Sequence, residues 1–557
     1  MFTMDSLVFL AIAVAILFAA VQRGGDGART MSEKTHRAIC GAAIATGVFV
    51  RLARLTSLPA GISAEEALVG VQAKALWQTG GFLFGQGLTT QLSQWAGETT
   101  GPLLAVLTAP FVGLFGMSKL TVRLPLALLS CAAMPAAYGL GEALSGRRAA
   151  RWMLLIAALC PIFVLEARMT CGSCAALYLL PIALCLIARG ITKPAALYPG
   201  MIVLALTAYA QDMYFFIAPA AILACAIIAL IFGRRKRHAV ISGAIGLLLC
   251  VPAMLTAFVN LTGAEGMTLL GLIRIPRLEG FEKAFMAENR SVGDKLWAVL
   301  IGGVFQVLRH ENIHQAMYTP DGMLALFMFS LPLMALGTLA LFARWTDGRR
   351  AAREKAAARA MVAATCAVTL AALVMFGSVG TLNTNGTTGL FDHSALILFD
   401  AVLMTAGLCT IERKNLRCAA AMVALMAVNF AWLAVQLFGG SYQANANVYF
   451  PGFEQMAARA AEIQAETGEK INVTGNVYPH IQPSDGAEMM FLYATDADMR
   501  TAEAERGTRY ETIYVSDDMQ PEADQIYLAR ADEISNWDLE GFDYEESEGY
   551  ALIYPAR

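Results

Sequence analysis

The sequence predicts an α-helical polytopic membrane protein that carries a small external α/β domain at its carboxyl end. Three observations predict this fold class. Hydrophobic residues make up 57% of the 557 residues and charged residues only 15%, which is more apolar than a soluble globular chain. Apolar runs of about 15 to 25 residues recur along most of the chain, and such runs cross or nearly cross a hydrocarbon core. From Ser441 onward the composition turns polar and acidic.

The apolar runs place a membrane domain over residues 1–440. We expect about twelve of the runs to cross the membrane, since each approaches the length of a spanning helix. Several are short, so their ends are approximate. The expected spans are 7–21, 38–55, 120–140, 152–165, 175–187, 195–210, 215–232, 239–259, 323–342, 361–376, 395–410 and 416–438.

Clusters of Lys and Arg fall in alternate loops between these spans, a distribution typical of the cytoplasmic side. A cleavable signal peptide has basic residues before its apolar run, whereas this chain begins Met1-Phe2-Thr3-Met4-Asp5. We therefore expect the first span to stay in the membrane and both termini to lie outside. The basic clusters occupy 23–37, 147–151, 189–193, 234–237, 349–359 and 413–417.

One apolar segment, 101–117, cannot cross without moving the next basic cluster to the outside. We therefore expect it to form a helix that lies in the outer interface. It belongs to the first external loop, 56–119. The other segments expected outside are 166–174, 211–212, 262–320 and 377–392.

Residues 441–557 contain 23 Asp and Glu residues but only seven Lys and Arg. The periodicity predicts a helix over 453–464 and strands over 470–474, 511–515, 525–528 and 550–554, hence a soluble α/β domain. Its acidity disfavours nucleic acid and anionic lipid as partners. A solvated surface held away from the membrane explains the same charge more simply.

The first external loop contains Ser63-Ala64-Glu65-Glu66 directly before an apolar run. A Ser followed three residues later by a Glu is the pattern of a capping box at a helix start, which gives Glu66 a structural role. Glu65 gains from the helix dipole, but the cap does not need its side chain. If one of the pair is chemical, Glu65 is the better candidate. An ordinary surface helix start is the alternative interpretation.

Two arginines, Arg123 and Arg168, fall at the outer ends of predicted spans. Arginine at that edge needs a carboxylate or phosphate partner, or else extends to the lipid headgroups. A single acid near the membrane is often only a solvated rim residue, and a single histidine an interfacial one. With that alternative open, the further candidates are Glu98, Arg274, Arg290, Asn383 and His393.

All eleven cysteines lie before residue 441, where most are expected to pack as small hydrophobic side chains. Cys171-Gly172-Ser173-Cys174 has the spacing of a redox pair or disulfide at the outer end of a span. A thioredoxin-like site needs a soluble strand and helix around the motif, and the sequence predicts neither there.

Five stretches between residues 52 and 189 stand in a characteristic order and spacing. They are Leu58-Pro59-Ala60-Gly61-Ile62-Ser63-Ala64-Glu65-Glu66-Ala67, Gly101-Pro102-Leu103-Leu104, Val122-Arg123-Leu124-Pro125, Gly146-Arg147-Arg148-Ala149-Ala150 and Glu166-Ala167-Arg168. With them the chain resembles bacterial glycosyltransferases of the GT-C superfamily, above all the family 39 relatives of protein O-mannosyltransferases and of lipid A aminoarabinose transferases. The later spans and the carboxyl-terminal domain match in layout.

The resemblance implies an enzyme of the bacterial plasma membrane that takes a sugar from a polyprenyl-phosphate carrier. It would transfer the sugar, with inversion, to an envelope glycopolymer, lipid or protein on the outer face. By position the catalytic carboxylate is Glu65, and Glu66 takes the second, more structural place. External arginines would stabilise the departing phosphate; the candidates are Arg168, Arg123, Arg274 and Arg290. Three further residues, Glu98, Asn383 and His393, would support the site.

The chain departs from the family pattern at several positions. Glu65 stands where relatives carry Asp, and Leu68 and Gly101 replace an Arg and a Lys of the aminoarabinose branch. Cys171 to Cys174 occupy the place of a second external carboxylate. The sequence neither requires nor excludes a divalent cation. A transporter or flippase for a lipid-linked or small polar substrate, and a catalytically silent relative, stay open as alternatives.

Overall fold

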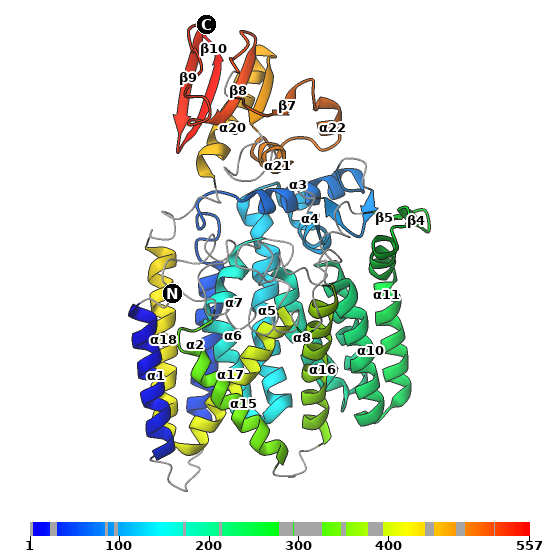
Figure 1. Ribbon diagram of the computed structural model, residues 1–557, viewed down its shortest axis with the longest axis vertical. Helices are drawn as coiled ribbons and strands as arrows, with labels where there is room; N and C mark the ends of the chain where they lie inside the picture. The colour runs from blue at the N-terminus through cyan, green and yellow to red at the C-terminus, as the bar shows by residue number, and fades with distance from the viewer. Residues whose placement is uncertain are drawn as a thin grey trace.

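The computed structural model consists of a bundle of long helices with a smaller unit of helices and strands at one end (Figure 1). Helix α3 (Ala64–Thr79) lies between the two. The structure describes residues 4–22, 31–83, 87–93, 99–170, 174–210, 214–277, 293, 326–346, 353–376, 394–439, 450–474, 485–516 and 519–556. Outside these residues lie four of the predicted site residues, namely Glu98, Arg290, Asn383 and His393.

The apolar runs of the sequence form the helices of the bundle, since a helix satisfies its own backbone donors and acceptors where water is absent. Each predicted span overlaps a helix among the described residues, or α6 and α7 together. The helices are α1 (Met4–Gln22), α2 (Glu33–Leu52), α5 (Lys119–Ser145), α6 (Arg147–Leu159), α7 (Pro161–Leu165), α8 (Cys174–Gly190), α9 (Leu197–Leu206), α10 (Tyr214–Phe232), α11 (Lys236–Thr262), α15 (Ser330–Thr346), α16 (Arg353–Phe376), α17 (Ser394–Lys414) and α18 (Leu416–Phe438).

Within the described ranges, six helices are long and apolar enough to cross a membrane, and seven if the bent pair of α6 and α7 counts as one span. The six are α5, α10, α11, α16, α17 and α18. Several of the others, including α1, α8 and α15, have shorter apolar stretches. The helices thus support a multi-pass membrane protein, and the number twelve remains a prediction.

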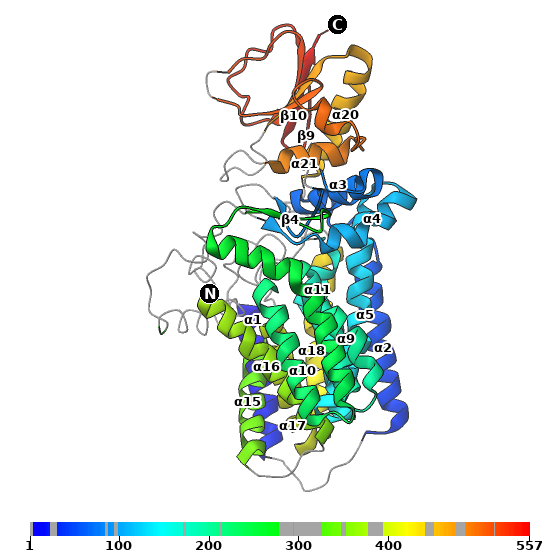
Figure 2. The same ribbon diagram turned by 90° about the vertical axis from the view of Figure 1, so that its right-hand side faces the viewer.

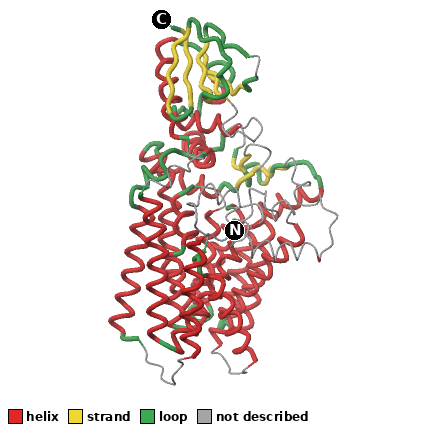
Figure 3. The backbone as a smooth tube through the Cα atoms, turned by 60° about the vertical axis from the view of Figure 1, so that its left-hand side comes forward, coloured by secondary structure: helices red, strands yellow, loops and turns green. Residues whose placement is uncertain are grey.

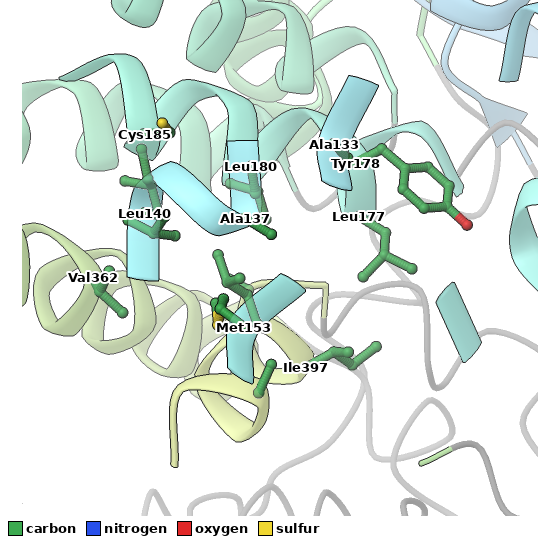
Figure 4. Close-up of a cluster of buried hydrophobic side chains, with 14 of the residues drawn as sticks. Ala133, Ala137, Leu140, Met153, Leu177, Tyr178, Leu180, Cys185, Val362 and Ile397 are labelled. Atoms are coloured by element: carbon green, nitrogen blue, oxygen red, sulfur yellow. The ribbon is translucent and has the colours of Figure 1, made fainter. Parts of the chain in front are cut away.

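The centre of the bundle is a cluster of buried apolar side chains from several helices (Figure 4). Ala137 of α5, Met153 of α6, Leu177 of α8, Val362 of α16 and Ile397 of α17 are all at most 3% exposed. The small residue on α5 allows the larger side chains of its neighbours to fill the space between helices, as close packing requires.

The basic clusters predicted to share one side of the membrane include residues that do lie together. Arg147, at the start of α6, donates to Glu33 at 2.7 Å, and Arg151 contacts Glu412 of α17 at 2.6 Å. Helix α5 ends next to Arg147 and begins at Lys119, at the other end of the bundle. The Nζ of Lys119 donates to Ala60 O in the first loop at 2.9 Å. The basic end and the first loop are therefore at opposite ends of the bundle.

The break between α6 and α7 bends the path of the chain by 61°. Pro161 has no N–H, so the carbonyl of Ala157, four residues earlier, has no helical donor. Arg51 supplies one: its Nη2 donates to Ala157 O and to Phe163 O, both at 2.7 Å. A buried arginine of α2 therefore closes the helix break that precedes Arg168.

The first external loop covers the end of the bundle that faces the carboxyl-terminal unit (Figure 2). It contains α3 and α4 (Leu103–Phe115), which pack on each other, and the hairpin of β2 (Leu92–Ser93) with β3 (Thr99–Thr100). The segment 101–117 thus forms the predicted short helix. Strand β1 (Leu88–Thr89) pairs in parallel with β5 (Ile273–Ile275), which pairs with β4 (Met267–Leu269).

The carboxyl-terminal residues form helices on a five-stranded sheet of order β7-β6-β8-β10-β9, drawn with its strands in yellow in Figure 3. The predicted helix and four predicted strands are present. Strand β9 is not predicted from the sequence, because its acidic residues have no buried face and therefore no alternating apolar pattern. The elements are α20 (Pro451–Thr467), β6 (Lys470–Thr474), α21 (Asp485–Ala494), α22 (Ala502–Glu505), β7 (Tyr510–Ile513), β8 (Gln525–Arg530), β9 (Phe542–Ser547) and β10 (Tyr550–Pro555).

The carboxyl-terminal unit packs directly on α3 through α21. Leu68 and Val71 of α3 share one buried apolar cluster with Met490 of α21. Lys74 of α3 adds an ion pair with Asp496 at 2.6 Å. Helix α3 is thus held from both sides, by α5 and α4 below it and by the carboxyl-terminal unit above it.

Candidate active site

The start of α3 has the predicted capping box. The Oγ of Ser63 accepts from Glu66 N at 3.2 Å, and Oε2 of Glu66 accepts from Ser63 N at 3.3 Å. Each interaction satisfies a backbone donor that the first turn of a helix leaves open. The structure therefore confirms the capping role predicted for Glu66.

Glu66 is also one half of a buried ion pair that the sequence does not reveal. Arg123 of α5 donates from Nε to Oε1 and from Nη2 to Oε2 of Glu66, both at 2.8 Å. The two side chains are at most 1% exposed. Thr170 N, beyond α7, donates to the same Oε1 at 3.2 Å. Because its carboxylate joins three segments of the chain, Glu66 is placed to orient the start of α3.

The other donors of Arg123 reach the backbone that leads to the acidic pair. Its Nη1 donates to Leu55 O at 3.1 Å and to Pro59 O at 3.0 Å, while Nη2 donates to Gly61 O at 2.7 Å. These carbonyls belong to an irregular segment and have no strand or helix ladder to accept from. The fork of the guanidinium suits this task, since it presents several donors in one plane.

Arg168 has a similar position one segment away. Its Nη1 donates to Val50 O at 2.5 Å, and its Nη2 donates to Leu58 O at 3.0 Å. The guanidinium also lies 5.7 Å from the ring centre of Phe438, a distance at which a cation interacts with an aromatic face. Val50 lies in the last turn of α2, where carbonyls lack helical donors.

The prediction that Arg168 and Arg123 bind the donor phosphate finds no support in this geometry. Both guanidiniums are at most 1% exposed and donate to groups of the protein itself. Arg274 on β5 differs from them, because its side chain is exposed near the first external loop. Among the described arginines predicted for this role, Arg274 alone faces solvent.

Glu65 lies at the second position of α3 and is half-buried, with its Oε2 enclosed. Another acid, Glu166, follows α7 and is 8% exposed. Its Oε2 accepts a hydrogen bond from Cys174 Sγ, at the start of α8, at 2.9 Å.

In the sequence, Glu166 stands in the same motif as Arg168. The signal that points to Arg168, a charged residue at the end of a predicted span, applies equally to Glu166. Cys174 is expected to pack or to take part in redox chemistry, and in the structure it donates to a carboxylate. Within the described residues, no three His, Cys, Asp or Glu side chains gather as metal ligands.

No protein-family model matches the chain, and no curated protein matches its sequence. Among solved structures, ArnT from Cupriavidus metallidurans, crystallised bound to undecaprenyl phosphate, superposes with a TM-score of 0.53 at 10% identity. The match covers 94% of this chain and 98% of that one. The fold is GT-C-like. The likeness holds for the fold, because identity this low identifies no shared residues.

A second GT-C-like structure, the oligosaccharyltransferase of Archaeoglobus fulgidus in its apo form, matches at a TM-score of 0.44 and 11% identity. That match covers 86% of this chain, and the chain spans 64% of the length of the oligosaccharyltransferase. The described acids of the first external loop differ in their surroundings. Glu66 is held in an ion pair with Arg123, and the adjacent Glu65 is half-buried.

Proposed function

We propose that the chain is a membrane glycosyltransferase that moves a sugar from a polyprenyl-phosphate-linked donor to an acceptor on the outer face. The observation that carries the proposal is the position of Glu65. It stands at the start of a helix whose neighbouring acid is fixed by Arg123, at the end of a bundle with a GT-C-like fold. The structural neighbour ArnT was crystallised with undecaprenyl phosphate, which supports a lipid phosphate as the leaving group.

In the proposed reaction Glu65 accepts the proton from a hydroxyl of the acceptor. The acceptor oxygen forms a bond to the anomeric carbon while the bond from that carbon to the phosphate oxygen breaks on the opposite face. Inversion follows from this displacement, and the lipid phosphate departs with the electron pair. A positioned base of this kind contributes about 10²- to 10⁴-fold to such a rate.

The buried arginines have a supporting role in this mechanism. Arg123 and Arg168 hold the segment between α2 and α3, so they would fix the position of Glu65. Small displacements of a reacting group lower rates strongly, so this support matters for catalysis. Arg274 takes the proposed phosphate role, since its cation is exposed at the same end of the bundle. Arg290, Glu98, Asn383 and His393 remain candidates from the sequence.

We also propose that the enzyme lies in the bacterial plasma membrane with both termini and the carboxyl-terminal unit outside. The alternation of basic clusters supports this orientation. An active site on the outer face is consistent with a lipid-linked donor, because the lipid anchors the activated sugar on the face where the acceptor lies. The acidic carboxyl-terminal unit argues against nucleic acid as a partner.

Transfer from a panel of labelled polyprenyl-phosphate sugars by the purified chain in lipid nanodiscs tests the proposal. The wild type should release polyprenyl phosphate and label an envelope acceptor fraction, and Glu65→Gln should not. A protein that moves the labelled lipid between leaflets without cleaving it would instead support a flippase. If neither the wild type nor Glu65→Gln cleaves any of the donors, the enzyme assignment is overturned.

A further inference from the structure

A small apolar hairpin, formed by β4 and β5, follows α11 at the end of the bundle that faces the first external loop. The strands pair antiparallel, with Met267 opposite Ile275 and Leu269 opposite Ile273. Leu272 N donates to Leu269 O at 3.1 Å and closes the two-residue turn between them. The hairpin lies beyond the end of α11, at the edge of the molecule (Figure 1).

The turn of this hairpin is both apolar and exposed. Leu270 is 86% exposed, and Leu272 is 68% exposed. Both turn residues have a positive φ, 53° at Leu270 and 69° at Gly271. Asparagine or glycine is favoured at such positions, and a bulky side chain is strained there. A leucine that is both strained and exposed gains little from packing within the chain, so it indicates a partner outside the chain.

The exposed apolar surface of the hairpin continues that of α11. This helix is one of the described helices that are long and apolar enough to cross a membrane. It exposes Leu248, Met254 and Phe258 at 70%, 45% and 56%, and in a spanning helix such side chains face lipid. Four residues separate the end of α11 from β4, so the surface of the same lipid layer is within reach of the turn.

The base of the hairpin is fixed to the helix and to the first external loop. Asn260, in the last turn of α11, donates from Nδ2 to Pro276 O at 3.1 Å. Ile275 is fully buried, and Thr90 N in the first loop donates to Arg274 O at 3.3 Å. The fold therefore sets the position of the turn relative to α11, and hence relative to the membrane that α11 crosses.

We propose that the turn of this hairpin inserts into the outer leaflet, with Leu270 and Leu272 among the lipid headgroups and upper acyl chains. Arg274 on β5 and Arg277 beyond it are both exposed. An arginine beside apolar side chains keeps its stem in apolar surroundings while its guanidinium reaches the headgroup phosphates. An apolar tip with cations behind it is the arrangement of a surface that binds the interface of a bilayer.

The inserted turn would also hold Arg274 at the depth of the headgroup phosphates. This consequence rests on the proposed function, in which Arg274 contacts the phosphate of the lipid-linked donor. The phosphate of such a donor lies at the same depth, since its lipid chain occupies the leaflet. The hairpin would thus present its cation to the donor at the membrane surface.

Fluorescence quenching in lipid nanodiscs tests the insertion without any transfer assay. A polarity-sensitive fluorophore is attached to Leu270→Cys, and nitroxide lipids carry the quencher either near the headgroup or deep in the acyl chain. The matched control is Tyr544→Cys on β9 of the carboxyl-terminal unit, where the tyrosine is 43% exposed. Labelling of the wild type gives the background, since the native cysteines of the described ranges are buried or half-buried.

The Leu270→Cys label should emit at a shorter wavelength than the Tyr544→Cys label. It should lose about half of its intensity or more to the shallow quencher and less to the deep one, as expected for a depth of about 5–10 Å. A label that emits as in water and is not quenched would overturn the insertion. A shorter wavelength without quenching by lipid would also overturn it, since protein, such as a second copy of the chain, would then cover the turn.

Leu270→Asn is a second test, because asparagine suits the turn but is polar. With the label on Leu272→Cys, quenching by the shallow nitroxide should fall by about half or more when Leu270→Asn is added. Unchanged quenching would overturn the role given to Leu270. If the wild type transfers no sugar but its labelled turn is quenched, the proposed function fails while the insertion stands. Normal transfer by a chain whose labelled turn is not quenched would have the opposite meaning.

Discussion

Arg123 and Glu66 form a two-pronged ion pair in which Nε and Nη2 each lie 2.8 Å from a different carboxylate oxygen. The pair joins α5 to the first turn of α3 across 57 residues of sequence. The other donors of Arg123 hold the carbonyls of Leu55, Pro59 and Gly61. The residue next to the proposed base is therefore among the most firmly fixed acids of the described structure.

Removing either partner should destabilise the protein strongly, because the other charge stays buried. We expect Glu66→Gln and Arg123→Met each to lower the free energy of unfolding by about 3–5 kcal/mol. Thermal unfolding in detergent measures the change. The control is Arg37→Gln, which removes the exposed partner of Glu33 and should leave the melting temperature unchanged. Equal, small shifts for all three variants would contradict the role given to the pair.

Arg168 and Arg274 should behave differently. Arg168→Gln removes donors from the carbonyls of Val50 and Leu58, so stability and transfer should fall together. Arg274→Gln removes an exposed cation, so the KM for the lipid-phosphate donor should rise by about 10-fold at an unchanged melting temperature. Donor titrations and thermal unfolding on the same preparations separate the two effects. A raised donor KM in a fully stable Arg168→Gln would restore Arg168 as a phosphate ligand.

Gly70 permits the close approach of α3, α5 and the carboxyl-terminal unit. A Cβ at this position would lie 2.9 Å from Val122 Cγ2 and 3.3 Å from the ring of Tyr493. Gly70→Ala should therefore destabilise the protein by about 1–3 kcal/mol, as overpacking does. Gly41→Ala is the matched control, since a Cβ there meets nothing within 4 Å. Identical melting temperatures for the two variants would show that the Tyr493 side chain moves aside at little cost in stability.

The sequence predicts those parts of the molecule that depend on local pattern. The capping box at Ser63 and Glu66 follows from spacing, and the helix and four strands of the carboxyl-terminal unit follow from periodicity. The sequence predicts that Arg123 and Arg168 need partners, but not which ones. The partners are the Glu66 carboxylate and backbone carbonyls that lie far away in the sequence. A motif indicates that a buried arginine needs acceptors, and only the fold decides whether phosphate or protein supplies them.

The contact between Thr170 and Glu66 likewise depends on the fold. The chain turns by 61° at the break before Pro161, and the residues after α7 then reach the start of α3. Pro161 marks a helix boundary in the sequence, but neither the direction of the turn nor the donor from Arg51 can be read from it. The capping role of Glu66 was thus predictable, and its contact with Thr170 was not.

The measurement that tests the central claim most directly is single-turnover transfer from a polyprenyl-phosphate sugar by Glu65→Gln beside the wild type. The account predicts a loss of at least about 100-fold in rate. It also predicts that Glu65→Gln stays folded, because the cap and the ion pair use Glu66. A wild-type rate in a folded Glu65→Gln would contradict the assignment of Glu65 as the base.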